Sequence, residues 1–221
     1  MIKAVLFDLD GTLYDRDALA EALFERHYVA FACELGGIAR ERFLRDVHAM
    51  DEHGHGDKDS GYPRLVRAWG LDAALAARLN EHFWASYDGL CTLDDDTART
   101  LRELRERRLT LGVITNGQGA RQRRKLATPG IAQSFDAVLV SGEEGVAKPD
   151  AEIFRRALER CGGVAAHEAL FVGDRPVAYV EGAHRAGLTA VWKFVPYWPA
   201  VVADAPAIRR LSELLPLVDA A

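Results

Sequence analysis

Short apolar segments alternate with amphipathic segments from about residue 96 to residue 192, and this alternation constrains the fold more than any other feature of the chain. The apolar segments are rich in β-branched residues and lack a polar–apolar alternation, as expected of strands covered on both faces. The alternation of strands and helices predicts a doubly wound, mostly parallel sheet of the Rossmann-like α/β class. The predicted strands are residues 3–7, 109–114, 137–140, 169–172 and 189–192.

Helical patterns lie between and after these strands, with apolar residues recurring on one face. The predicted helices begin near Asp96, run from Pro149 to Gly162, span residues 177–185 and, after a proline-bearing surface segment at 196–206, occupy residues 208–215.

The region from residue 15 to residue 93 departs from the alternation, because it contains only helical patterns. Residues 18–35 and 75–87 each carry apolar side chains at helical spacing, and a polar, glycine-containing stretch at 51–61 separates the helices. We interpret this region as a small all-helical domain inserted after the first strand. The core then consists of residues 1–14 and 94–221.

Composition excludes several classes of protein. The formal net charge of −5 argues against nucleic-acid binding, which requires a basic surface. No apolar segment approaches the ~18 residues of a membrane helix, and the first residues lack a targeting pattern, so we expect a cytoplasmic protein that does not bind membranes. Three widely spaced cysteines (Cys33, Cys91 and Cys161) predict free thiols rather than disulfides or a zinc site.

Polar residues follow the predicted strands at the points where the strands end. These segments are Asp8-Leu9-Asp10-Gly11-Thr12, Thr115-Asn116-Gly117, Lys148-Pro149 and Gly173-Asp174. The carboxyl ends of parallel strands meet at one edge of a doubly wound sheet, which is where such sheets bind ligands. We therefore expect three carboxylates, a lysine, a threonine and an asparagine in one crevice.

This set of side chains suits phosphoryl transfer. Oxygen-only ligands favour Mg²⁺ over zinc, and a cation with N–H donors can stabilise a phosphoryl group. A carboxylate can attack phosphorus to form an aspartyl-phosphate. A second carboxyl can protonate the leaving alcohol and then activate water.

In the order and type of these four motifs, the chain resembles the haloacid dehalogenase superfamily. The helical insertion resembles the C1-type cap of that family, and the carboxylate at position 10 resembles its phosphatase branch. The resemblance implies that Asp8 is the nucleophile and a Mg²⁺ ligand, and that Asp10 is the general acid/base and a ligand through its carbonyl. It further implies that Thr115, Asn116 and Lys148 bind the phosphoryl group and that Asp174 completes the metal site.

The fourth motif departs from the family pattern. Many members carry a second acidic residue where this chain has Tyr179, and a small residue where it has Arg175. The change either weakens metal binding or lets Arg175 assist phosphate binding or substrate choice.

Two polar segments lie outside the motifs. Around His53-Gly54-His55-Gly56 we expect a solvated, flexible loop, and in a capped enzyme His55 and Arg64 are candidates for choosing the substrate. The basic run at residues 121–125 is interpreted as the solvated face of a helix.

The sequence thus predicts a Mg²⁺-dependent phosphatase, active as a monomer or homodimer on a small sugar phosphate or nucleoside monophosphate. Two alternatives share the site: a phosphomutase, and a weakened member that binds a phosphorylated ligand or a partner, which Tyr179 would mark. A phosphate-accepting receiver domain is a third, against which the helical insertion argues.

Overall fold

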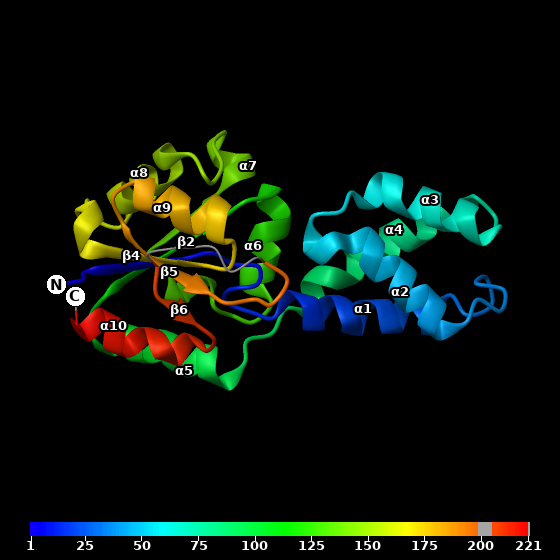
Figure 1. Cartoon of the computed structure of the whole chain (residues 1–221), viewed down its shortest axis with the longest axis horizontal. Helices are drawn as coiled ribbons and strands as arrows, with labels where there is room; N and C mark the ends of the chain where they lie inside the picture. The colour runs from blue at the N-terminus through cyan, green and yellow to red at the C-terminus, as the bar shows by residue number, and fades with distance from the viewer. Residues whose placement is uncertain (199–204, 221) are drawn as a thin grey trace. The chain divides into compact units, whose positions relative to one another are not determined.

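The computed structural model describes residues 1–198 and 205–220, so most of the proline-bearing segment at 196–206 lies outside the described residues. The chain divides into two compact units. The core unit combines Met1–Tyr14 with Thr92–Ala221, and the helical unit is Asp15–Cys91. Figure 1 shows the elements of each unit. Among the described helices, none has both the length and the apolar character needed to cross a bilayer.

The core unit is built on a six-stranded parallel sheet with the order β3-β2-β1-β4-β5-β6. The strands are β1 (Ala4–Phe7), β2 (Thr110–Thr115), β3 (Ala137–Val140), β4 (Ala169–Gly173), β5 (Thr189–Lys193) and β6 (Ala207–Ile208). The chain moves outward from β1 to β3 and returns to β4 on the other side of β1. The boundary between β1 and β4 is therefore the topological switch point of the sheet. The predicted α/β fold is confirmed.

Helices cover both faces of this sheet, with α8 and α9 on one side and α5 and α10 on the other (Figure 1). Strand β1 is consequently apolar at every position and buried throughout. The helices of the core unit are α5 (Asp95–Glu106), α6 (Gly119–Ala127), α7 (Ser141–Glu144), α8 (Ala151–Arg160), α9 (Glu181–Arg185) and α10 (Leu215–Ala220).

Two predicted helices of the core differ in the structure. The segment expected as one helix at 177–185 starts as a π-helical turn, Pro176–Val180, and only then becomes α9. The prediction of a helix at 208–215 is wrong at its start, because Ile208 belongs to β6 and pairs with Lys193 of β5. A short 3-10 turn, Leu211–Leu214, follows before α10 begins. Tertiary pairing with β5 outweighs the local helical pattern here.

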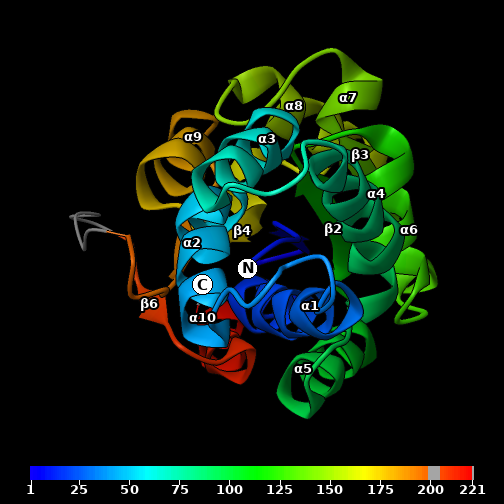
Figure 2. The same ribbon diagram turned by 90° about the vertical axis from the view of Figure 1, so that its right-hand side faces the viewer.

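The helical unit consists of α1 (Arg16–Ala30), α2 (Arg40–Asp51), α3 (Lys58–Trp69) and α4 (Ala74–Tyr87). Each helix contacts the next, and α4 returns to α1, so that the four form a closed ring in Figure 2. The centre of the ring is aromatic, with Phe24, His27, Tyr62 and Phe83 fully or almost fully buried. The helix predicted at 18–35 ends earlier, at Ala30, before two glycines of positive φ.

The segment between α2 and α3 is organised around Asp51. Its carboxylate forms ion pairs with Arg16 and, at 2.7 Å, with Lys58, and it accepts a hydrogen bond of 3.0 Å from the Gly54 N–H. All three charged side chains are buried. His53 and His55, for which a solvated loop was predicted, are exposed, whereas Asp51 and Lys58, which flank that segment, are buried.

Candidate active site

The carboxylate of Asp8 lies at the switch point, directly after β1. Its backbone N–H donates to the Val172 carbonyl of β4 at 2.8 Å, and the residue is only 3% exposed. The Lys148 ammonium forms an ion pair with Asp8 and also donates to the Ile114 carbonyl at 2.6 Å. Three segments more than 30 residues apart in sequence thus meet at one buried ion pair.

A second carboxylate, that of Asp174, lies beside Asp8 at the end of β4. The residue is 5% exposed, and the Trp192 indole N–H fixes its backbone carbonyl at 2.9 Å. Burial, together with the negative charge of Asp8, raises the pKa of Asp174 to about 8. Burial also raises the pKa of Asp8, against the attraction of Lys148. Two adjacent buried carboxyls disfavour each other's ionised form, so a bound cation would stabilise both as carboxylates.

The turn after β1 brings the chain against Asp174. Gly11 has a φ of +78°, and a Cβ atom on it would lie 2.8 Å from Asp174 Oδ2. Glycine is needed here both for the left-handed backbone and for the close approach.

The third carboxylate, that of Asp10, points toward α6. It accepts hydrogen bonds from Lys125 Nζ at 2.7 Å, from Gln122 Nε2 at 2.9 Å and from the Tyr14 hydroxyl. Although burial opposes ionisation, Lys125 and these hydrogen bonds lower the pKa of Asp10 to about 2. Asp10 is therefore held as a carboxylate in this arrangement.

Asn116 positions the peptide of Lys148. Its Oδ1 accepts from the Lys148 N–H at 3.0 Å, and its Nδ2 donates to the Lys148 carbonyl at 2.9 Å. The Gly117 N–H donates to Ser141 Oγ at 3.0 Å. The second motif thus supports the backbone of Lys148 and the loop that follows β3. Direct contact of Thr115 or Asn116 with a phosphoryl group stays a prediction.

Comparison with known proteins agrees with this geometry. Residues 2–187 match the family of haloacid dehalogenase-like hydrolases. The chain belongs to this family.

Named relatives include a glyceraldehyde 3-phosphate phosphatase of Methanopyrus kandleri, 35% identical over 99% of this chain and 97% of the relative. A pyrimidine 5′-nucleotidase of Escherichia coli is 36% identical over 85% of this chain and 84% of the relative. Among solved structures, the hydrolase YfnB of Bacillus subtilis bound to magnesium has a TM-score of 0.78 and 25% identity, covering 99% of both chains. The predicted family and the hydrolase class are confirmed.

In this haloacid dehalogenase-like hydrolase, the oxygen atoms at the switch point fit a hard cation. The candidate ligands are the adjacent carboxylates of Asp8 and Asp174, and the backbone carbonyl of Asp10 stays a predicted third ligand. The Asp10 carboxylate is turned toward Lys125, and among the described residues no group of three or more His, Cys, Asp or Glu side chains is arranged for a metal. Two carboxylates and one carbonyl suit Mg²⁺, which keeps several of its waters in proteins.

Two residues of α6 hydrogen-bond the Asp10 carboxylate, although the basic run that contains them was interpreted as the solvated face of a helix. Gln122 and Lys125, three positions apart, lie on one buried face of α6, while Arg123 and Arg124 are exposed. Gln122 Nε2 also hydrogen-bonds Thr115 Oγ1 and, at 3.1 Å, the Asn116 carbonyl. The solvated interpretation is wrong for these two residues. Their i, i+3 spacing directly after the second motif was the available signal.

The candidate specificity residues lie in different units. Arg175 belongs to the core, where its guanidinium lies 5.2 Å from the Tyr179 ring and 5.0 Å from the Trp198 ring. His55 follows the turn Glu52–Gly54 of the helical unit and is exposed. Arg64 of α3 is also exposed and lines a groove of about 930 Å³ between α3 and α4. Contact of these side chains with a substrate stays a prediction.

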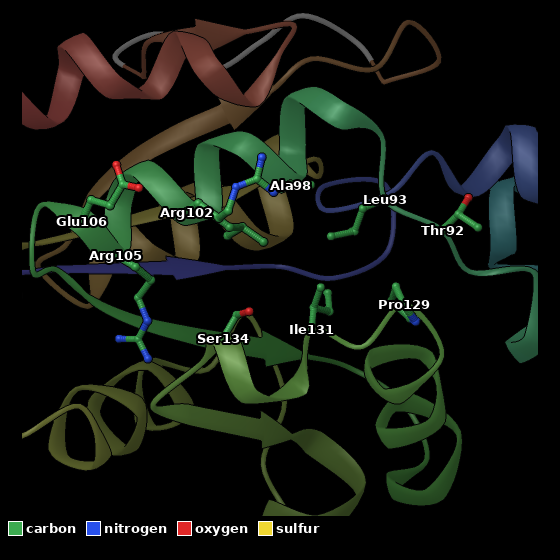
Figure 3. A pocket seen from close by; sticks show the side chains of 10 residues that line it. Thr92, Leu93, Ala98, Arg102, Arg105, Glu106, Pro129, Ile131 and Ser134 are labelled. Atoms are coloured by element: carbon green, nitrogen blue, oxygen red, sulfur yellow. The ribbon is translucent and has the colours of Figure 1, made fainter.

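The core carries another hollow, of about 700 Å³, between α5 and the segment that follows α6 (Figure 3). Its lining includes the apolar side chains of Leu93, Leu101 and Ile131, together with Arg102 and Arg105 of α5. Asp8, Asp10 and Asp174 are not among the residues that line this hollow.

Proposed function

We propose that this chain is a Mg²⁺-dependent phosphatase that hydrolyses a small organic phosphate monoester through an aspartyl-phosphate on Asp8. The observation that carries the proposal is the buried Asp8 carboxylate, paired with Lys148 and adjacent to Asp174 at the switch point. A nucleophile in this position lies beside a cation that can neutralise phosphoryl charge and beside a second carboxyl that can help to bind a metal.

The residues have separate roles in this proposal. An Asp8 oxygen attacks phosphorus, and the bond from phosphorus to the leaving oxygen breaks. Lys148 compensates the negative charge shared by Asp8 and the phosphoryl oxygens. When bound by Asp8, Asp174 and the Asp10 carbonyl, Mg²⁺ would supply further charge compensation.

Proton transfer falls to Asp10. In the second half of the reaction it takes a proton from the water that attacks the aspartyl-phosphate, and its ionised state suits this role. In the first half a protonated Asp10 gives its proton to the leaving oxygen, and it regains one from the attacking water in the second half. The protonated form requires its contacts with Lys125 and Tyr14 to loosen.

The substrate is proposed to be a sugar phosphate or a nucleoside monophosphate. The relatives named above act on a triose phosphate and on pyrimidine nucleotides, and the first of them aligns over almost the whole chain. The helical unit, inserted after β1, is proposed to act as a cap that excludes water during the reaction. We further propose that the enzyme works in the cytoplasm as a monomer or homodimer.

A chromogenic phosphomonoester tests the proposal. Turnover should require Mg²⁺, stop with a chelator, and fall on the order of 10³-fold or more in Asp8→Asn. Asp136→Asn, which changes a carboxylate paired with Arg105 outside the site, is the matched control and should keep its activity. A panel of sugar phosphates and nucleoside monophosphates then identifies the class of substrate by kcat/KM.

Two outcomes would favour the alternatives. Activity that depends on a sugar bisphosphate and returns the phosphoryl group to the product would indicate a phosphomutase. Binding of phosphorylated ligands without turnover at any Mg²⁺ concentration would indicate a non-catalytic member and contradict the proposal.

A further inference from the structure

Tyr179 lies against the ammonium of Lys148. The residue belongs to the π-helical turn Pro176–Val180 that follows β4, and it is 7% exposed. Lys148 Nζ lies 3.8 Å from the centroid of the Tyr179 ring, well inside the ~6 Å range of a cation–π contact. The Phe171 ring lies farther away, at 5.4 Å. Tyr179 is thus the nearer aromatic partner of the lysine that pairs with the nucleophile.

The other contacts of Lys148 leave a place for this ring. An ammonium group has three N–H donors. Asp8 and the Ile114 carbonyl each accept one of them, and both acceptors belong to the ends of strands β1 and β2. The Tyr179 ring approaches from the turn after β4. A buried cation gains more from an aromatic face than an exposed one, because water does not compete for it.

Arg175 fixes the ring from the same turn. Its guanidinium lies 5.2 Å from the centroid of the Tyr179 ring and 5.0 Å from that of the Trp198 ring. The backbone N–H groups of Tyr179 and Val180 both donate to the Arg175 carbonyl, at 3.0 and 3.2 Å. The ring that faces Lys148 is therefore held through its backbone and lies beside the Arg175 guanidinium.

We propose that Tyr179 is a positioning residue whose aromatic face holds the Lys148 ammonium against Asp8. A carboxylate in its place would offer Lys148 a second anionic partner and draw it from the nucleophile. The uncharged ring stabilises the cation without competing with Asp8. This inference rests on the proposed function, because the Asp8–Lys148 pair is what the ring supports.

Two substitutions separate the aromatic face from the hydroxyl and from bulk. Tyr179→Phe keeps the ring and removes the hydroxyl, whereas Tyr179→Leu keeps an apolar side chain and removes the π-face. We expect Tyr179→Phe to bind orthovanadate, in the presence of Mg²⁺, within about twofold of the wild-type protein. Tyr179→Leu should bind it about tenfold more weakly and lose kcat more than it changes KM, as expected from the loss of one buried cation–π contact.

A double-mutant cycle shows whether the effect passes through Lys148. The unfolding equilibrium constants of the wild-type protein, Tyr179→Leu, Lys148→Met and the double variant are measured in urea. We expect Tyr179→Leu to raise the unfolding constant about tenfold more in the wild-type background than in the Lys148→Met background. Should Tyr179→Leu not fold, Tyr179→Met, which also lacks a π-face, takes its place in both experiments.

Two results would overturn the inference: equal orthovanadate affinity in Tyr179→Leu and Tyr179→Phe, or a destabilisation that is the same in both backgrounds. Either would reduce Tyr179 to a packing residue. The proposed function fails differently, by an absence of turnover in the wild-type protein. The urea cycle does not depend on turnover, so the two failures are distinguishable.

Discussion

Residue 11 controls how closely the first turn can approach the Asp174 carboxylate. Gly11→Ala adds a methyl group 2.8 Å from Asp174 Oδ2 and places alanine at a φ of +78°. We expect a loss of about 1–2 kcal/mol of stability from the backbone and, in addition, weaker Mg²⁺ binding because the carboxylate must move. Isothermal titration with Mg²⁺ and kcat/KM measure the second effect.

Gly130→Ala is the matched control for this substitution. Gly130 has a φ of +70°, but nothing lies within 4 Å of its Cβ position. It should lose similar stability and leave Mg²⁺ binding unchanged. If both variants bind Mg²⁺ as the wild-type protein does, the close approach of Gly11 to Asp174 is not needed for Mg²⁺ binding.

Single residues also show how far the sequence could predict the site. Asp8, Lys148 and Asp174 were predictable because each follows a strand, and parallel strands bring their carboxyl ends together. The role of Tyr179 was not, since the sequence marked only a missing acidic group and no spacing rule places its ring over Lys148. The orientation of the Asp10 carboxylate toward α6 likewise depends on tertiary packing.

At the scale of elements, helix α6 contributes one face to the site and one to solvent. Lys125→Met removes the ammonium 2.7 Å from Asp10 Oδ1 but keeps most of the side chain. Without this charge the pKa of Asp10 should rise, because burial then acts with less opposition. We expect the acidic limb of the pH–rate profile to move to higher pH, because Asp10 then loses its ionised form, and with it the ability to accept a proton, at a higher pH.

Arg124→Met, one residue away on the exposed face of the same helix, controls for the change of charge and of helix composition. Its pH–rate profile should overlay that of the wild-type protein. A Lys125→Met profile that also overlays it would show that Lys125 does not act on Asp10.

The turn between α2 and α3 depends on a single carboxylate. Asp51→Ala would leave Arg16 and Lys58, which are 6% and 4% exposed, without their shared buried partner. Breaking a buried ion pair from one side typically costs about 3–5 kcal/mol. We expect a loss of this size in urea denaturation. Asp57→Ala removes an exposed helix cap of α3 and should cost only about 1 kcal/mol; equal losses would mean that the buried cluster carries no special weight.

The elements themselves were predicted unevenly. The strands β1 to β5 were found to within a residue at each end, because a buried parallel strand leaves a compact apolar signature. Strand β6 was missed since it has two residues and depends on pairing with β5. The sequence did not predict the bounds of α2 and α3, because the segment that joins them is polar. Its Asp51 and Lys58 are buried only because they pair with each other, and no local pattern marks that pairing.

For the molecule as a whole, His27 of the helical unit is a group whose protonation is expected to lower stability in acid. His27 lies at the aromatic centre of this unit with 0% exposure, and its ring centroid is 4.7 Å from that of His82. Among the described residues, its Nε2 has no hydrogen-bond partner. Burial and the neighbouring His82 lower the pKa of His27 to about 3.

The sign of the effect follows from proton binding. Between about pH 6.5 and pH 3 the unfolded chain binds a proton at this histidine and the folded chain does not, so acid favours unfolding. The free energy of unfolding should fall by up to roughly 1.4 kcal/mol per pH unit from this group alone. His27→Leu removes the titration and should flatten the dependence between pH 6 and pH 4.5 in urea denaturation followed by circular dichroism. Phe24→Leu, at a neighbouring buried position without an ionisable group, should lower stability equally at both pH values. A slope unchanged by His27→Leu would place the acid sensitivity of the protein in another group.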